Sequence, residues 1–258
     1  MKINYDLHTH TIYSHGKGTI EENAQAAKEK GLEGIAITDH GFSHPAFGMK
    51  RKKLAEMKEH CGRAEELTGV KVLLGIESNI RGASGKIDAE PRDYAALDVI
   101  LAGVHRFIYY DKFSDYLRLL FANQLDSLLK KEASEAQKRY NTRCYVQAIR
   151  NNPIDAVTHP GYLCPCFADE VARCASDYGT YFEINTKKVH LSDDEWRKVI
   201  DTGVRFVVDS DAHSVDRVGD TALAEDLFSR VDFPFDRIDN VDGKTPSFRF
   251  AEWKKRNG

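Results

Sequence analysis

The chain alternates short apolar runs of strand length with longer amphipathic stretches, and this alternation constrains its fold more than any other feature. Seven runs are predicted to be strands, at residues 3–7, 34–38, 70–76, 97–104, 154–158, 180–185 and 204–209. Strands that are separated by helices run parallel to one another, and their crossovers are right-handed. Because no low-complexity linker interrupts the 258 residues, the sequence predicts one α/β domain with a substantial core.

The amphipathic stretches predict helices at residues 20–30, 50–68, 169–178, 192–202 and 221–231. Two of these helices begin with a capping-box pattern, Thr19 with Glu22 and Ser192 with Glu195. A further segment, residues 113–150, is mainly helical and longer than a single crossover needs. Residues 232–258 are predicted to be a short C-terminal tail.

Large apolar residues recur at helical spacing in the first half of the 113–150 segment. They are Phe113, Tyr116, Leu117, Leu120, Phe121, Leu125, Leu128 and Leu129. A stripe of this kind predicts one buried helix face, because such stripes usually pack in the core. A lid over the site and a contact between copies of the chain are the alternatives.

Composition argues against several classes of protein. Charged residues make up 30% of the chain and nearly balance, with a formal net charge of -3 and no basic block, which disfavours both long nucleic acid and a membrane surface as partners. No apolar run is long enough to cross a membrane, and residues 1–6 lack the apolar core of a signal peptide. Five cysteines at irregular positions do not suggest a disulfide framework. These patterns predict a cytoplasmic protein.

Candidate metal ligands gather where the predicted strands end. They are seven of the ten histidines and two carboxylates: His8, His10, His15, His40, Glu77, His105, His159, Asp211 and His213. The carboxyl ends of parallel strands meet at one rim of the sheet, where chemistry collects in such folds. Histidines scattered over a core or a surface would have no reason to prefer strand ends. The pattern therefore predicts a metal site.

The ligand types indicate the class of metal. Without cysteine the site offers nitrogen and oxygen atoms, which suit Zn, Mn or Fe better than magnesium or calcium. Nine ligands are too many for a single tetrahedral ion, so the sequence predicts two to three divalent transition metals. The carboxylate of Glu77 is able to bridge two of them.

Six motifs occur in order along nearly the whole chain: Asp6–Thr11, Thr38–Gly41, Gly75–Glu77, His105, His159–Gly161 and Ser210–His213. Together they resemble the PHP (polymerase and histidinol phosphatase) superfamily. The resemblance implies a distorted (β/α)7 barrel, similar to a TIM barrel, with a trinuclear metal site and phosphoesterase activity. It also implies that the whole of 1–258 is a PHP domain, with the 113–150 segment as the departure from the family pattern.

The resemblance further implies three metal positions, each with its own ligands. One metal would be held by His8, His10, Glu77 and Asp211, the second by His15, His40 and His213, and the third by Glu77, His105 and His159.

Three basic residues near the same rim are candidates for substrate binding: Arg106, Lys187 and Arg217. A guanidinium group matches the geometry of phosphate oxygens. For each arginine the alternative is a solvated side chain or a structural ion pair. His44 and His190 follow strand ends as well but carry less weight.

The sequence Cys164-Pro165-Cys166 is a separate oddity. It could be redox-active or bind a stray metal, but it lacks the Cys-x-x-Cys spacing, and idle thiols are common in cytosolic proteins.

Together these features predict a metal-dependent phosphomonoesterase for a small phosphorylated substrate, in which a metal-activated hydroxide attacks phosphorus and no protein nucleophile takes part. Three alternatives stay open: a phosphodiesterase or nuclease acting on small nucleotides, a metal-dependent C–N hydrolase, and a non-catalytic metal-binding regulatory protein. The C–N hydrolase is disfavoured because no predicted strand ends in lysine. The sequence leaves the oligomeric state open.

Overall fold

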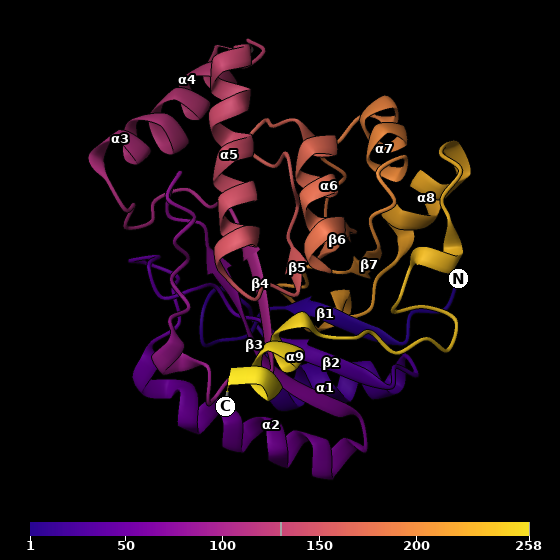
Figure 1. Cartoon of the computed structure of the whole chain (residues 1–258). Helices are drawn as coiled ribbons and strands as arrows, with labels where there is room; N and C mark the ends of the chain where they lie inside the picture. Colours follow the sequence, from indigo (N-terminus) through magenta and orange to yellow (C-terminus); the bar gives the residue numbers. More distant parts are fainter. Residues whose placement is uncertain (130, 258) are drawn as a thin grey trace.

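The computed structural model describes residues 1–129 and 131–257 (Figure 1). Residues 130 and 258, which fall in the predicted segment 113–150 and the predicted tail 232–258, lie outside the described residues. Within the described part of the chain, seven parallel strands form one sheet in sequence order. The strands are β1 (Tyr5–Thr9), β2 (Gly34–Ile37), β3 (Lys71–Asn79), β4 (Val99–Gly103), β5 (Ala156–Val157), β6 (Tyr181–Asn185) and β7 (Phe206–Asp209).

Helices surround this sheet, and both predicted capping boxes are present. The helices are α1 (Ile20–Glu29), α2 (Leu54–Thr68), α3 (Phe113–Asp115), α4 (Asn123–Leu128), α5 (Glu135–Asn151), α6 (Ala168–Tyr178), α7 (Asp193–Ile200), α8 (Ala222–Arg230) and α9 (Arg249–Asn257). A π-helical stretch, Tyr116–Ala122, joins α3 to α4. Short 3-10 helices lie at Arg51–Lys53, Pro91–Asp93, Val215–Arg217 and Phe235–Arg237. None of the described helices is both long and apolar enough to cross a membrane.

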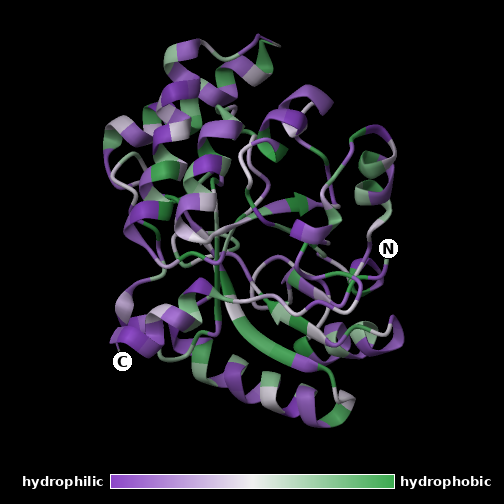
Figure 2. Ribbon diagram, turned by 45° about the vertical axis from the view of Figure 1, so that its right-hand side comes forward, coloured by the Kyte–Doolittle hydropathy of each residue, from purple (hydrophilic) through white to green (hydrophobic). Residues whose placement is uncertain are grey.

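Two layers of apolar side chains hold the fold together. Along each strand, residues that face the helices alternate with residues that face the barrel interior. The strands are mostly hydrophobic, whereas the helices alternate between hydrophilic and hydrophobic residues (Figure 2). The interior layer consists of Leu7, Ala36, Val99, Leu101, Ala156, Tyr181 and Val207. It fills the barrel below the carboxyl ends of the strands.

The barrel is nearly closed, and its seam lies between β1 and β7. Near the carboxyl ends of these strands, His10 N donates to Ala212 O at 2.8 Å. Nearer the amino ends, the Asn240 side chain lies between the strands. Val208 N donates to Asn240 Oδ1 at 2.9 Å, and Asn240 Nδ2 donates to Tyr5 O at 2.8 Å. Hydrogen bonds of the Asn240 side-chain amide thus replace part of the backbone hydrogen-bond ladder between β1 and β7. The predicted distorted (β/α)7 barrel is confirmed.

Two buried aspartates also bind the backbone across the seam. Asp209 Oδ1 accepts from Leu7 N at 2.8 Å, while Asp6 accepts from Ser210 N at 3.1 Å and from Gly219 N at 2.7 Å. Burial raises the pKa of both carboxyl groups. These contacts fix the ends of the two strands, from which four of the predicted ligands project.

The helical parts differ from the prediction in two ways. The apolar stripe of the 113–150 segment is mainly exposed, so the prediction of a buried face is wrong: Leu120 is buried, but Phe113 is 74% exposed and Leu128 is 72% exposed. The predicted tail contains α9, whose Phe250 is fully buried and donates its N–H to Asp155 Oδ1 at 2.8 Å. Residues 232–257 therefore contribute to the core.

Candidate metal centre

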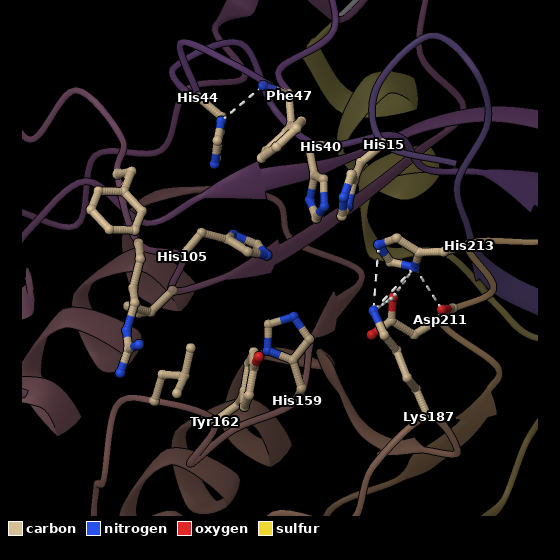
Figure 3. A pocket seen from close by; sticks show the side chains of 14 residues that line it. His15, His40, His44, Phe47, His105, His159, Tyr162, Lys187, Asp211 and His213 are labelled. Atoms are coloured by element: carbon tan, nitrogen blue, oxygen red, sulfur yellow. Dashed lines mark hydrogen bonds and ion pairs between the residues drawn. The ribbon is translucent and has the colours of Figure 1, made fainter. Parts of the chain in front are cut away.

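The nine predicted ligands lie together at the carboxyl ends of the strands, and several of them point toward a shared centre in Figure 3. His8 and Glu77 belong to strands β1 and β3, and the others follow strand ends: His10 and His15 after β1, His40 after β2, His105 after β4, His159 after β5, and Asp211 and His213 after β7.

An irregularity in β1 turns its histidines inward. Asp6 pairs with Ile35 and Thr9 pairs with Ile37, so two residues of β1 oppose one residue of β2. Leu7 lies in the interior layer, and a regular strand would therefore turn His8 away from the interior. The extra residue restores the inward direction from His8 onward, which is how bulges re-aim side chains beside functional sites.

The His-x-His pair converges on one point together with a carboxylate. His8 Nε2 lies 3.1 Å from His10 Nε2. Asp211 Oδ1 lies 3.3 Å from His10 Nε2 and 3.8 Å from His8 Nε2. Ligand atoms about 2.1 Å from a tetrahedral ion lie about 3.4 Å from one another. The three side chains therefore have the spacing of ligands around one cation.

Glu77 lies at the centre of the cluster and is fully buried. Its Oε1 lies 2.7 Å from His159 Nε2, 3.1 Å from His105 Nε2 and 3.3 Å from His8 Nε2. Its Oε2 lies 2.8 Å from His40 Nδ1. The two oxygens thus face different histidines, as those of a carboxylate that bridges metal ions would.

A third group of histidines, His15, His40 and His213, lies near His10. The ring centroids of His40 and His213 lie 4.3 Å and 4.2 Å from that of His10. His15 lies further out, with ring centroids 5.2 Å from His213 and 6.1 Å from His40. All nine predicted residues are thus brought into one cluster.

Several of these ring nitrogens are buried without a hydrogen-bond partner among the described residues. They are Nδ1 of His10, Nδ1 of His105 and Nδ1 of His159. A buried polar group without a partner costs free energy unless a ligand binds it. Nitrogen and carboxylate oxygen atoms in this arrangement suit divalent transition metals.

The pKa values of His10 and His40 are consistent with metal binding. Burial, reinforced by neighbouring His40, holds the pKa of His10 well below its usual value, and burial lowers the pKa of His40 to about 4. Both rings are therefore neutral at pH 7, as metal coordination requires. Burial opposes ionisation of Glu77, but His105 and His8 hold the pKa of its carboxyl group well below the usual range.

Sequence reasoning missed Glu183, which lies in β6 and is buried. Its Oε1 accepts from His8 Nδ1 at 2.5 Å, and its Oε2 accepts from His159 N at 2.5 Å and from Asn185 Nδ2 at 3.1 Å. Asn185 Nδ2 also lies within 3.3 Å of Asp211 Oδ2. The available signal was a pair of polar residues, two positions apart, in an apolar strand.

The PHP domain family model matches residues 6–187, which is more than half of the chain. The chain belongs to the PHP domain family. It is 31% identical over 268 residues to a probable phosphatase of Caldanaerobacter subterraneus subsp. tengcongensis, covering 100% of this chain and 95% of the relative. A probable phosphatase of Acetivibrio thermocellus is also 31% identical, over 99% of this chain and 97% of the relative.

A solved structure shares the fold of this member of the PHP family. It is the histidinol phosphate phosphatase of Lactococcus lactis subsp. lactis, in complex with zinc, L-histidinol and phosphate. The TM-score is 0.60 at 16% sequence identity, and the match covers 95% of this chain and 99% of that chain.

A cavity of about 220 Å³ opens above the ligands of the PHP domain (Figure 3). Arg106 and Lys187 line it, and two guanidinium nitrogens of Arg106 are buried without a hydrogen-bond partner among the described residues. Lys187 Nζ lies 3.4 Å from Asp211 Oδ1. Arg217 lies outside the cavity lining, paired with Asp220 at 2.5 Å.

Aromatic side chains line part of the cavity. Phe47, Phe107 and Tyr162 line it with His44, and His190 packs on Tyr162 with ring centroids 4.5 Å apart. Burial lowers the pKa of His190 to about 3. These rings lie beside the ligands: the ring centroid of Phe47 lies 4.4 Å from that of His15, and that of Tyr162 lies 5.5 Å from that of His159.

Backbone strain gathers around the same cavity. Four of its lining residues have a positive φ although they are not glycine: Phe107 at 57°, His159 at 32°, Leu163 at 51° and Asp211 at 48°. Such conformations are held in place by the surrounding structure and cluster at functional sites.

The cysteines lie away from the ligands. All five are free and buried. Burial raises the pKa of Cys166 to about 12 and also raises that of Cys164, which makes thiolate chemistry unfavourable there.

Proposed function

We propose that this PHP domain is a metal-dependent phosphomonoesterase that acts on a small phosphorylated molecule at a site of two to three divalent transition metals. The observation that carries the proposal is Glu77, whose two oxygens face different histidines within a ring of nitrogen ligands. Membership of the PHP family and relatives named probable phosphatases support a metal-dependent phosphoesterase.

The nine residues would divide into three sets around Glu77. His8, His10 and Asp211 with Glu77 would hold one metal, His15, His40 and His213 a second, and His105 and His159 with Glu77 a third. Zn, Mn and Fe suit this donor set. Bound metals of this kind activate water at neutral pH and neutralise charge on a phosphoryl group.

The other residues of the cavity would position the substrate. The buried guanidinium of Arg106 has unused donors for the oxygens of a phosphate or for another anionic group of the substrate. Lys187 would turn from Asp211 and His213 toward the phosphoryl oxygens. The aromatic side chains that line the cavity would exclude water from the leaving group. Arg217, already engaged with Asp220 and with Thr186 O, would hold its loop in place.

The first experiment combines metal analysis with hydrolysis. Two to three equivalents of Zn, Mn or Fe per chain are expected in the purified protein, together with hydrolysis of p-nitrophenyl phosphate that chelation abolishes and metal restores. Histidinol phosphate belongs in the first substrate panel, because the L. lactis protein of the same fold was solved with L-histidinol and phosphate. Preference for bis-p-nitrophenyl phosphate would favour a phosphodiesterase, and preference for an amide a C–N hydrolase. Metal binding without hydrolysis of any of these substrates would contradict the proposal that the protein is an enzyme.

A second experiment tests the positioning residues. Arg106→Ala and Lys187→Ala are expected to raise KM by roughly 10- to 100-fold, because a hydrogen bond to a charged group contributes about 1.5–3 kcal/mol. Arg197→Ala is the matched control, since that arginine is exposed on α7 and pairs with Asp194. An unchanged KM in both cavity variants would remove these residues from the substrate site.

A further inference from the structure

A helical arm that follows β4 exposes an unusually large apolar surface. We define the α3–α4 arm as residues 113–129, which comprise α3, the π-helical stretch and α4. In Figure 1 the arm lies beside the end of α5 that is distant from α9, projecting past the barrel. Its exposed apolar residues are Phe113 (74%), Tyr116 (40%), Leu117 (43%), Phe121 (59%), Leu125 (44%), Leu128 (72%) and Leu129 (53%).

The inner side of the arm is already occupied. Leu119 and Leu120 are buried. Beside them, Gln137 Nε2 of α5 donates to Asn141 Oδ1 at 2.9 Å, and Asn141 Nδ2 donates to Asn123 Oδ1 at 2.9 Å. These three amides are buried, so turning the arm to bury its outer face would leave several polar groups without partners. The arm is therefore fixed with its apolar face outward.

The π-helical stretch aligns the exposed residues. Its i→i+5 hydrogen bonds widen the turn, so that residues four positions apart, Leu117, Phe121 and Leu125, stay near one line along the arm. Phe113 stacks on Tyr116 at the beginning of this line, with ring centroids 5.9 Å apart. The result is one continuous apolar stripe that includes three aromatic residues, a residue class that protein interfaces favour.

The size of the stripe matches one half of a protein interface. At roughly 200 Å² for a large side chain, the exposed fractions amount to roughly 750 Å² of surface. The largest apolar patch on a monomer is typically about 300–600 Å². A standard stable interface buries about 800 Å² on each partner. The stripe therefore supplies nearly the area that one side of a stable dimer needs.

Charge indicates the partner. The arm contains one basic residue, Arg118, and two acidic residues, Asp115 and Asp126, so it carries little net charge and does not select a strongly charged partner. A balanced apolar surface is compatible with itself across a two-fold axis, the commonest symmetry of soluble oligomers. We propose that two copies of this chain pack their α3–α4 arms against each other to form a two-fold symmetric dimer.

The arm is also linked to the metal centre. Tyr116 of the arm contacts Tyr110, with ring centroids 6.0 Å apart, and Tyr110 Oη donates to His105 O at 3.2 Å. Phe107, six residues before the arm, lines the cavity. Packing of two arms would thus steady the wall of each active site from outside.

Sedimentation velocity and light scattering between 1 and about 50 μM test the dimer. The wild-type protein is expected to have twice the chain mass of 29.2 kDa. Phe121→Glu with Leu128→Glu places two charges in the stripe and should weaken association by on the order of 100-fold or more, giving monomers. Leu67→Glu is the matched control, because Leu67 is 67% exposed on α2, away from the arm, and this variant should remain a dimer.

Far-UV circular dichroism and bound-metal content check that the double variant is folded. If it is not, Phe121→Ser with Leu128→Ser replaces it in the same measurement, with the same expected loss of the dimer. A wild-type monomer at 50 μM, a higher oligomer, or a dimer that survives in the folded arm variant would overturn the proposal.

Discussion

Glu183→Gln is the most informative single substitution in the metal centre. The carboxylate accepts a hydrogen bond from His8 Nδ1 with one oxygen and from His159 N with the other, both at 2.5 Å. Because Nδ1 of His8 must then carry the proton, Nε2 is left with its lone pair toward the metal position. Glutamine keeps the shape but has one acceptor oxygen, so either the His8 ring or the His159 N–H loses its partner.

Loss of one hydrogen bond to a charged group costs about 1.5–3 kcal/mol, and loss of such an outer partner typically lowers metal affinity by about 10- to 100-fold. We expect a fall of this size in the Zn²⁺ affinity of Glu183→Gln, measured by competition with a chromogenic chelator. KM at saturating metal should change little, because Glu183 does not line the main cavity.

Glu195→Gln is the matched control. Glu195 closes the capping box of α7 through Ser192 and lies outside the ligand cluster, so its substitution should leave metal affinity unchanged. Wild-type affinity in Glu183→Gln would refute the idea that this carboxylate orients His8.

Three further predictions follow from the structure. Removal of the metals with a chelator should lower the Tm measured by scanning calorimetry by roughly 8–16 °C. The reference is protein at a free metal concentration of about 1,000 times Kd, where metal binding stabilises the folded state by about 4 kcal/mol. An unchanged Tm would contradict a metal site in the folded protein. A thiol reagent should modify all five cysteines of the denatured chain but, in the same time, none of the five buried cysteines of the folded protein. Rapid modification of Cys164 or Cys166 in the folded protein would contradict their raised pKa values. Burial raises the pKa of Asp155 from 3.8 to about 7, so the folded chain binds a proton at this carboxyl group more tightly than the unfolded chain does. The stabilisation that the protonated carboxyl group contributes should therefore be lost as pH rises from about 4 through 7. Asp155→Asn should therefore make the slope of the unfolding free energy against pH more positive by up to about 1.4 kcal/mol per pH unit between pH 5 and 6, in urea titrations, and an equal slope would refute the shift.

The ligands could be predicted because strand ends are visible in a sequence. An apolar run that stops at His105 or His159 identifies the end of a strand, and parallel strands bring such ends to one rim. The sequence predicted this convergence without any knowledge of strand order. Glu183 was invisible to the same reasoning because it lies inside a strand, where a polar residue gives no sign of which ligand it contacts.

Other features depend on tertiary structure that no local pattern encodes. The bulge in β1 decides whether His8 points inward, yet its extra residue resembles any other strand residue. The stripe of the α3–α4 arm follows the helical pattern of a buried face, and only the buried amides of Asn123 and Gln137 on its other side reveal that it faces outward. Asn240 stands in an irregular segment, so its place in the barrel seam could not be anticipated.

The seam has a consequence for synthesis on the ribosome. Asn240 bonds to Tyr5 across a sequence separation of 235 residues. At about 5–20 residues per second, the partner of β1 leaves the ribosome roughly 10–50 s after β1 itself. Throughout this interval the first strand has one edge without its final neighbour, and such an edge invites pairing with other chains. Barrel closure is therefore a late step in synthesis, and until then the nascent chain exposes a strand edge of the kind that chaperones cover.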